Sequence, residues 1–193
     1  MEIVGYHGTT EENGNEIIKS QEYKYDKSRN HWMGDGIYFF EDSYLAERWA
    51  DDMVKKTKKA PMVLVNKLYC DKDKCLDLTK AENKDKFRTD FIEFLNEIET
   101  IGNEDLVIGN ENTSLKEMLS FYYNYLKNQN GYDIIKNTFV KKNTNYATTK
   151  ISKKSINMDF DLFTGLCFFE VQICASNNSV IKEIQYYSKE EET

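Results

Sequence analysis

The sequence predicts an α+β domain, in which strands from both ends of the chain form a sheet and helices lie between them. Three observations predict this fold. The 193 residues are 40% hydrophobic and 13% aromatic, which supplies enough buriable surface for a packed core. Strand-like segments occur toward both ends, whereas helical periodicity dominates residues 80–130. One proline and no Gly/Ser-rich linker indicate a single domain over residues 1–193.

The first seventy residues alternate strands with helices. Thr10 and the two glutamates after it offer N-cap chemistry for a helix, and apolar residues at three- and four-residue steps mark a second helix after Ser43. Gly34 and Gly36 form a turn before a buried aromatic strand. In chain order we expect a strand, a helix, a polar connection, a strand, a helix and an interior strand, over residues 3–7, from about 10, 21–29, 37–40, 43–53 and 62–69.

The second half begins with two amphipathic helices and then returns to strands. Apolar residues recur at helical spacing over residues 85–99 and 115–126, so we expect a helical insertion at about residues 80–130. A short strand or turn is expected before it, near Asp77. After Gly131, β-branched and aromatic residues predict four strands, over residues 132–135, 137–140, 166–174 and 180–187.

Charge and composition argue against several classes of protein. With 26 basic and 33 acidic groups, the net charge of -7 gives no general attraction to nucleic-acid phosphates. Six lysines between Asp133 and Asp159, with no acidic residue among them, are interpreted as a solvated loop or edge, with a local basic patch as the alternative. The four cysteines lack the paired spacing and histidine partners of a zinc site, so no metal is predicted.

The start of the sequence carries neither a basic region nor an apolar segment typical of a secretion signal. No window approaches the roughly 18 to 20 apolar residues that span a bilayer. We therefore expect a cytoplasmic protein that does not enter membranes and keeps its thiols free.

Two motifs near the start of the sequence carry the candidate chemistry, Tyr6-His7-Gly8-Thr9 and Met33-Gly34-Asp35-Gly36-Ile37-Tyr38-Phe39. Each alone fits an ordinary structural role, as a strand end or a tight turn. Together, and followed by a helix with Ala46 and Trp49, they resemble the catalytic domain of the poly(ADP-ribose) polymerases and their diphtheria-toxin-like relatives. These form the His-Tyr-Glu branch of the ADP-ribosyltransferases. The resemblance covers residues 4–50 well and the last thirty residues weakly.

The resemblance implies a split β-sheet core with flanking helices, and NAD as the co-substrate. It implies that His7 binds the adenosine ribose of NAD and that the backbone of Gly8 holds the nicotinamide carboxamide. A glycine suits this role because no Cβ keeps its amide from the ligand. Thr9 takes the place of the family's small hydroxyl residue.

The resemblance also assigns the aromatic contacts to nicotinamide. Tyr38 matches the tyrosine that stacks on the ring, Trp49 lies where a second aromatic covers the other side, and Gly36 keeps the loop close to the ligand. These residue types suit a pyridinium ring, because aromatic faces attract planar cations by roughly 0.5 to 2 kcal/mol. We therefore expect the Tyr38 ring to face a ligand cleft.

Two positions depart from the family pattern. The family's serine that bonds the carboxamide corresponds to Ala46, so that contact is missing or comes from elsewhere, with Thr9 or Ser43 as candidates. The lysine before that serine in the polymerases corresponds to Leu45. The second departure argues against polymer elongation and favours transfer of a single ADP-ribose unit.

The catalytic carboxylate is expected on a strand near the end of the sheet. Cleavage of the nicotinamide bond builds positive charge on the ribose, which a nearby carboxylate stabilises. Glu170 is the favoured candidate, and Gln172 projects from the same face of the strand because side chains alternate. A different register would place the key position near Leu166, with Asp159 and Asp161 as the alternatives.

The implied activity is mono-ADP-ribosylation of a macromolecular acceptor, protein or nucleic acid, as in bacterial toxins, effectors or phage-defence enzymes. NAD hydrolysis and a catalytically inactive NAD- or ADP-ribose-binding module are the alternatives. Transfer of a 2′-phosphate from RNA is disfavoured because the sequence has few arginines. Acceptor recognition is expected from residues 141–158 or from the helical insertion, because loops outside the cofactor pocket usually set it.

Overall fold

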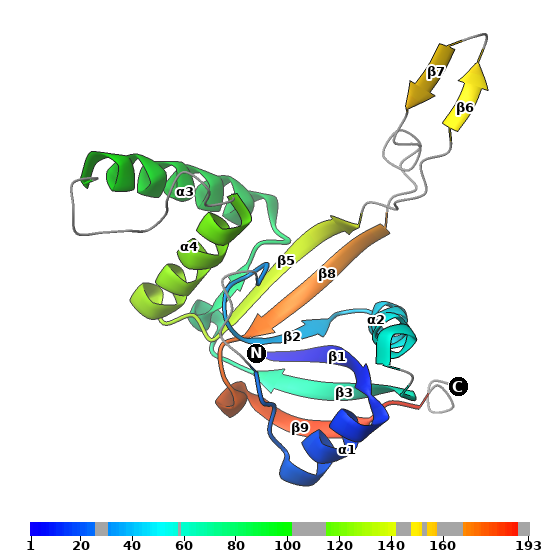
Figure 1. Ribbon diagram of the computed structural model, residues 1–193. Coiled ribbons are helices and arrows are strands. Elements are labelled where there is room, and N and C mark those ends of the chain that lie inside the picture. The colour runs from blue at the N-terminus through cyan, green and yellow to red at the C-terminus, as the bar shows by residue number, and fades with distance from the viewer. Residues whose placement is uncertain are drawn as a thin grey trace.

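Over the residues that the structure describes, the protein is an α+β fold built on one seven-stranded mixed sheet and four α-helices (Figure 1). The computed structural model describes residues 1–25, 31–57, 59–101, 115–141, 148–151, 154–157 and 168–188. In chain order the elements of the first half are β1 Glu2–Thr10, α1 Glu11–Ser20, β2 Ile37–Phe40, α2 Ser43–Thr57, β3 Pro61–Tyr69 and β4 Cys75–Asp77. Those of the second half are α3 Ala81–Ile101, α4 Leu115–Asn130, β5 Ile134–Lys141, β6 Thr148–Ile151, β7 Lys154–Asn157, β8 Phe168–Ala175 and β9 Ile181–Tyr186.

The sheet has the order β4-β5-β8-β2-β1-β3-β9, and only β4 and β5 are parallel neighbours. The pairing changes abruptly in its middle. β1 pairs with β3 over its whole length, from Glu2 opposite Tyr69 to Thr10 opposite Pro61. β1 and β2 are paired at a single register position, Tyr6 opposite Phe40. The sheet therefore has two well-paired parts that meet at a narrow junction.

Helices α1 and α2 cover opposite faces of the β1–β3 part of the sheet. Adjacent residues of β3 point to opposite faces. Leu64 belongs to the core cluster against which Ile17 of α1 packs, whereas Val63 lies in the cluster that contains Ala46 of α2. Thr10 begins α1 as predicted, because its hydroxyl accepts a hydrogen bond from the Asn13 N–H at 3.4 Å.

Helices α3 and α4 lie beside the β5 side of the sheet, away from α1 (Figure 1). They hold each other through aromatic rings: the centroids of Phe91 and Tyr122 are 5.0 Å apart, and those of Phe87 and Tyr123 are also 5.0 Å apart. Tyr123 also belongs to a buried cluster with Cys174 of β8. The helical pair is thus packed onto the sheet on the β8 side.

Most predicted elements are present, with differences in extent. β1 continues past His7 to Thr10, because β3 pairs with it along that whole stretch. The two strands predicted over residues 132–140 are one strand, β5, since β8 pairs with it from Ile134 to Lys141. The hairpin of β6 and β7 was not predicted, and these two strands pair with each other in a separate sheet.

Three of the four cysteines, Cys70, Cys75 and Cys174, are free, as expected. Cys167 lies outside the described residues. None of the helices in the described ranges combines the length and the apolar content that a membrane span needs.

Candidate functional site

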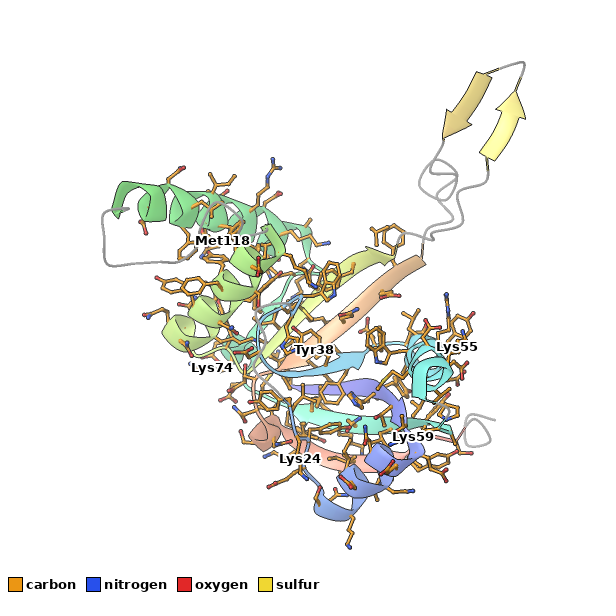
Figure 2. The ribbon with its side chains drawn as sticks, viewed as in Figure 1. Lys24, Tyr38, Lys55, Lys59, Lys74 and Met118 are labelled. Atoms are coloured by element: carbon orange, nitrogen blue, oxygen red, sulfur yellow. The ribbon has the colours of Figure 1, made fainter. Side chains whose placement is uncertain are left out.

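A pocket of about 830 Å³ lies at the junction between β1 and β2. Its volume falls in the range of roughly 300 to 1,000 Å³ that small-molecule sites occupy. Consecutive residues of β2, from Ile37 to Phe40, border it, so both faces of that strand contribute. This is possible because the strands are paired only at Tyr6 and Phe40. Tyr38 lies near the centre of the sheet, between α4 and α1 (Figure 2).

Six of the eight residues that the sequence assigned to the site line this pocket. They come from β1, the turn before β2, β2 itself, α2 and β8, and are His7, Gly8, Gly36, Tyr38, Trp49 and Gln172. The fold therefore gathers residues separated by up to 165 positions in the sequence, from 7 to 172. Thr9 and Glu170 are not among the described residues of the lining.

His7 connects β1 to β2 through a side-chain hydrogen bond, beside the one position where the two strands are paired. Its Nδ1 lies 2.8 Å from the carbonyl oxygen of Tyr38, and because a carbonyl can only accept, Nδ1 is the donor. The His7 ring also packs edge-on against Tyr23, with 4.9 Å between centroids.

Burial lowers the pKa of His7, and the hydrogen bond to the Tyr38 carbonyl opposes this in part. A neutral imidazole whose Nδ1 donates keeps Nε2 as an acceptor. His7 is therefore suited to accept a hydrogen bond from a ligand hydroxyl.

Tyr38 is fixed at both its backbone and its hydroxyl. The phenolic O–H donates to the Gly34 carbonyl at 2.6 Å and accepts from the Met33 N–H at 2.8 Å. Burial raises the pKa of Tyr38 well above its ordinary value, so the phenol stays protonated. This residue offers a held, neutral ring to the pocket and no acid or base.

Gly8 is needed for close packing of α2 as well as for its place in the lining. A Cβ at this position would overlap the backbone carbonyl oxygen of Ala46. Ala46 is fully buried in the cluster between α2 and the sheet, and its side chain is not among the described pocket residues. A side chain at position 46 therefore meets the core rather than the pocket.

The turn before β2 depends on two glycines. Gly34 has φ +74, a left-handed backbone that favours glycine, and a Cβ there would overlap the amide oxygen of Asn124 in α4. A Cβ on Gly36 would clash with the carbonyl oxygen of Ala175. Gly36 therefore allows β2 to lie close to β8 at the edge of the pocket.

Trp49 presents an exposed indole to the pocket from α2. Its side chain is 49% exposed, and its ring lies 6.3 Å from that of Phe40 at a tilted angle. An aromatic side chain this exposed beside a pocket is available to a planar ligand.

Gln172 and Glu170 lie together on β8, as strand alternation predicted. Gln172 borders the pocket, and its Nε2 donates to Oε2 of Glu170 at 3.3 Å. Glu170 is 8% exposed and stands opposite Phe139 of β5. The Glu170 carboxylate thus lies outside the pocket lining and is connected to it by its hydrogen bond with Gln172.

Neither predicted substitute for the missing serine lines the pocket. Thr9 is 3% exposed and lies opposite Met62 of β3. Ser43 accepts a hydrogen bond from the Tyr187 hydroxyl at 3.1 Å and borders a different, smaller cavity. Asp159 and Asp161, the alternative carboxylates, lie outside the described residues.

Several lining residues were missed from the sequence. Tyr23 and Tyr25 lie in the stretch interpreted as a polar connection, although two tyrosines in such a connection are a signal of burial or binding. His31 and Trp32 directly precede the glycine turn, and the His31 and Tyr38 ring centroids are 5.7 Å apart. The sequence reasoning placed the turn at the site but did not assign His31 or Trp32 to it.

Two basic side chains, Lys19 and Lys24, also border the pocket, and Figure 2 labels Lys24 at the α1 side of the fold. Glu16 and Glu22 border it as well, so the charges there are mixed. Within the described part of the chain, no group of three or more His, Cys, Asp or Glu side chains is placed to hold a metal ion.

Comparison with known proteins adds one similarity. The uncharacterized protein MJ0359 of Methanocaldococcus jannaschii is 29% identical over 197 residues, which covers 96% of this chain and 87% of that protein. No family model matches the sequence, and no solved structure matches it. The similarity extends over nearly the whole of both chains and carries no activity with it, so function has to be argued from the pocket.

Proposed function

We propose that this protein is an NAD-consuming ADP-ribosyltransferase, with an ADP-ribosyltransferase-like catalytic domain over residues 1–193. It releases nicotinamide and transfers one ADP-ribose unit to a macromolecular acceptor. One observation carries the proposal: of the six residues that the resemblance assigns to contact with NAD, all except Thr9 border one pocket of suitable size. They come from segments far apart in the chain.

The nicotinamide end of NAD binds to the aromatic wall of the pocket, which Tyr38 and Trp49 form. Tyr38 stacks on the pyridinium ring, and Trp49 covers it from α2. Tyr38 suits this role because its hydroxyl is held and its phenol stays neutral, which leaves the ring face as the part that meets a ligand. Gly8 offers backbone groups to the carboxamide, and Gly36 leaves room beside the ring.

His7 binds the adenosine ribose in this proposal. A ribose hydroxyl donates to Nε2, while the Nδ1 hydrogen bond to the Tyr38 carbonyl fixes the tautomer and the ring position. One side chain thereby couples the ribose site to the strand that carries the stacking ring.

Glu170 and Gln172 act on the bond that breaks. Nicotinamide leaves with the electron pair of the N-glycosidic bond, positive charge develops at the ribose, and the acceptor's nucleophile forms the new bond and loses a proton. The Glu170 carboxylate stabilises that charge. Gln172, which lies in the wall and is hydrogen-bonded to Glu170, orients the carboxylate or the acceptor.

An inactive NAD-binding module is the second candidate. It is favoured by the position of Glu170, which is buried behind the wall, and by the burial of Ala46 where the family has a carboxamide-binding serine. NAD hydrolysis, with water as the acceptor, uses the same pocket and remains an alternative activity. We propose that the protein acts in the cytoplasm as a toxin, effector or defence enzyme.

Release of nicotinamide from NAD tests the proposal. The wild-type protein is incubated with NAD, with and without a cell extract as the source of acceptor, and mass spectrometry locates any added ADP-ribose. Release that requires the extract indicates a transferase, and release without it indicates a hydrolase. Binding of NAD without release of nicotinamide indicates the inactive module. If the protein neither binds NAD nor releases nicotinamide, the NAD assignment is wrong.

Substitution of the carboxylate tests the mechanism. Glu170→Gln keeps the shape of the side chain and removes its charge, so it should spare NAD affinity and slow nicotinamide release about 100- to 1,000-fold. Gln172→Ala should cost less. Glu82→Gln, an exposed change of the same type on α3, is the control. An unchanged rate in Glu170→Gln, together with loss in Asp159→Asn or Asp161→Asn, would move the carboxylate to the preceding segment.

A further inference from the structure

Helix α4 contacts the turn before β2 through the side chain of Lys127. The half-buried Lys127 places its Nζ 2.8 Å from the Met33 carbonyl oxygen, 2.5 Å from that of Asp35 and 3.2 Å from Sγ of Cys174. An ammonium group has three N–H donors, and three acceptors surround this one. Lys127 therefore fastens the turn over residues 33–35 to α4 and to β8.

A second residue of α4 holds the same turn. The Asn124 amide oxygen accepts from the Asp35 N–H at 2.7 Å, and its Nδ2 donates to the Asp35 carboxylate at 3.3 Å. Gly34 permits this approach, since a Cβ there would overlap Asn124. Two residues one helical turn apart thus hold Met33 and Asp35, the residues on either side of Gly34.

The same turn also forms hydrogen bonds with the Tyr38 hydroxyl. The Met33 N–H and the Gly34 carbonyl are backbone partners of that hydroxyl, which also interacts with the Cys174 thiol. Met33 is bonded to Lys127 through its carbonyl. A continuous chain of hydrogen bonds therefore runs from Lys127 through the backbone of Met33 to Tyr38. No part of α4 is among the described residues of the pocket lining.

We propose that Lys127 is a positioning residue for the aromatic wall of the pocket: it fixes the turn over residues 33–35 and thereby the Tyr38 ring that stacks on nicotinamide. The inference rests on the proposed function for the identity of the ligand. It assigns the helical pair a role in shaping the NAD pocket, in addition to any part in acceptor recognition.

The experiment compares two ligands that differ at the nicotinamide end. Dissociation constants for NAD and for ADP-ribose, which lacks the ring, are measured by calorimetry on the full chain. Lys127→Met keeps the length and apolar stem of the side chain and removes its donors. We expect it to weaken NAD binding by about 2- to 30-fold, the range of a lost cation–π contact, and to leave ADP-ribose binding unchanged. Lys127→Arg, which retains donors, should recover most of the NAD affinity.

The control is Lys86→Met, the same chemical change at an exposed position of α3, which should alter neither dissociation constant. Asn124→Ala removes the other grip on the turn and should reproduce the selective loss if Lys127→Met fails to fold. Equal losses for both ligands, or no loss for NAD, would overturn the positioning role.

A measurement without ligand separates this inference from the proposed function. In two-dimensional NMR spectra of the free protein, the Met33 and Asp35 amide resonances report the turn directly, because Tyr38 and Asn124 accept from these two N–H groups. Both resonances should shift or broaden in Lys127→Met and return toward their original positions in Lys127→Arg. Unchanged resonances would refute the inference even if NAD binds, whereas shifted resonances in a protein that does not bind NAD would refute the proposed function alone.

Discussion

Tyr38 combines a ring that borders the pocket with a hydroxyl that holds the turn before β2. The two parts can be separated by substitution. Tyr38→Phe leaves the Met33 N–H and the Gly34 carbonyl without their partner and should lower the free energy of unfolding by about 1 to 3 kcal/mol. Tyr38→Ala removes the ring as well and should weaken NAD binding more than Tyr38→Phe does. Chemical denaturation and calorimetry measure the two effects, and equal NAD affinity in both variants would exclude ring stacking.

From the sequence we predict that a Tyr38→Ala protein stays folded and loses NAD affinity, since the ring is expected to face a cleft. The structure adds a cost in stability to this prediction. The ring borders the pocket, but the hydroxyl makes two hydrogen bonds to backbone groups four and five positions earlier in the chain. A motif match identifies the residue type at a site, whereas its partners depend on how the preceding turn folds.

His7 predicts how stability depends on pH. Because burial lowers its pKa below the ordinary value of 6.5, the unfolded chain takes up this proton at a higher pH than the folded protein. The free energy of unfolding should therefore fall as pH drops below 6.5, by up to about 1.4 kcal/mol per pH unit, until folded His7 is protonated as well. Its contribution is fully present above that range.

Urea unfolding at about pH 7.5 and about pH 5.5 tests this dependence on His7. His7→Gln can still donate to the Tyr38 carbonyl but does not titrate, so it should lose less stability between the two pH values than the wild type loses. Identical losses in the two proteins would assign the acid sensitivity to other groups. NAD binding should weaken only at lower pH, where folded His7 itself becomes protonated and loses its Nε2 acceptor.

At the scale of elements, the packing of α2 against β1 sets one side of the pocket. Gly8→Ala would force a Cβ into the Ala46 carbonyl oxygen, which is backbone and cannot rotate away. We expect a loss of about 1 to 3 kcal/mol or more and weaker NAD binding, because α2 carries Trp49. The melting temperature and the NAD dissociation constant measure these effects.

Gly14→Ala is the matched control for this change. A Cβ at Gly14 meets the side-chain sulfur of Met62, the flexible part of a residue that can move, and alanine favours the helix by about 1 kcal/mol over glycine. Stability should therefore change little or increase. A Gly8→Ala protein as stable as the Gly14→Ala protein would show that α2 adjusts freely at this contact.

The elements that local patterns define were predicted well. Thr10 caps α1, and the helices of the insertion occur at Ala81–Ile101 and Leu115–Asn130. The sequence predicts two strands separated at Lys136, yet pairing with β8 keeps β5 continuous through that residue. Strand continuity is decided by a partner far away in sequence, which a local pattern does not contain.

At the scale of the whole molecule, the site combines predictable and unpredictable parts. His7 and Tyr38 were identified because they stand in short motifs. The hydrogen bond from Lys127 to Met33 joins residues 94 positions apart, and no sequence motif indicates this contact. Tyr23, likewise, enters the pocket wall from a stretch whose composition resembles a surface loop. Tertiary contacts of this kind arise from packing and are absent from any one segment.

The narrow junction between β1 and β2 has a consequence for amide hydrogen exchange. The ladder between β1 and β3 protects its amides along nine residues, so those amides exchange with deuterium slowly. Along the β2 side, strand pairing is found at Tyr6 and Phe40 alone, and the pocket occupies the adjoining space. Amides on that side of β1 and β2 should be among the faster-exchanging ones of the sheet in the free protein. A ligand bound there would shield these amides as a paired strand does and slow their exchange. In the occupied protein, the exchange rates of the two parts of the sheet should therefore become similar.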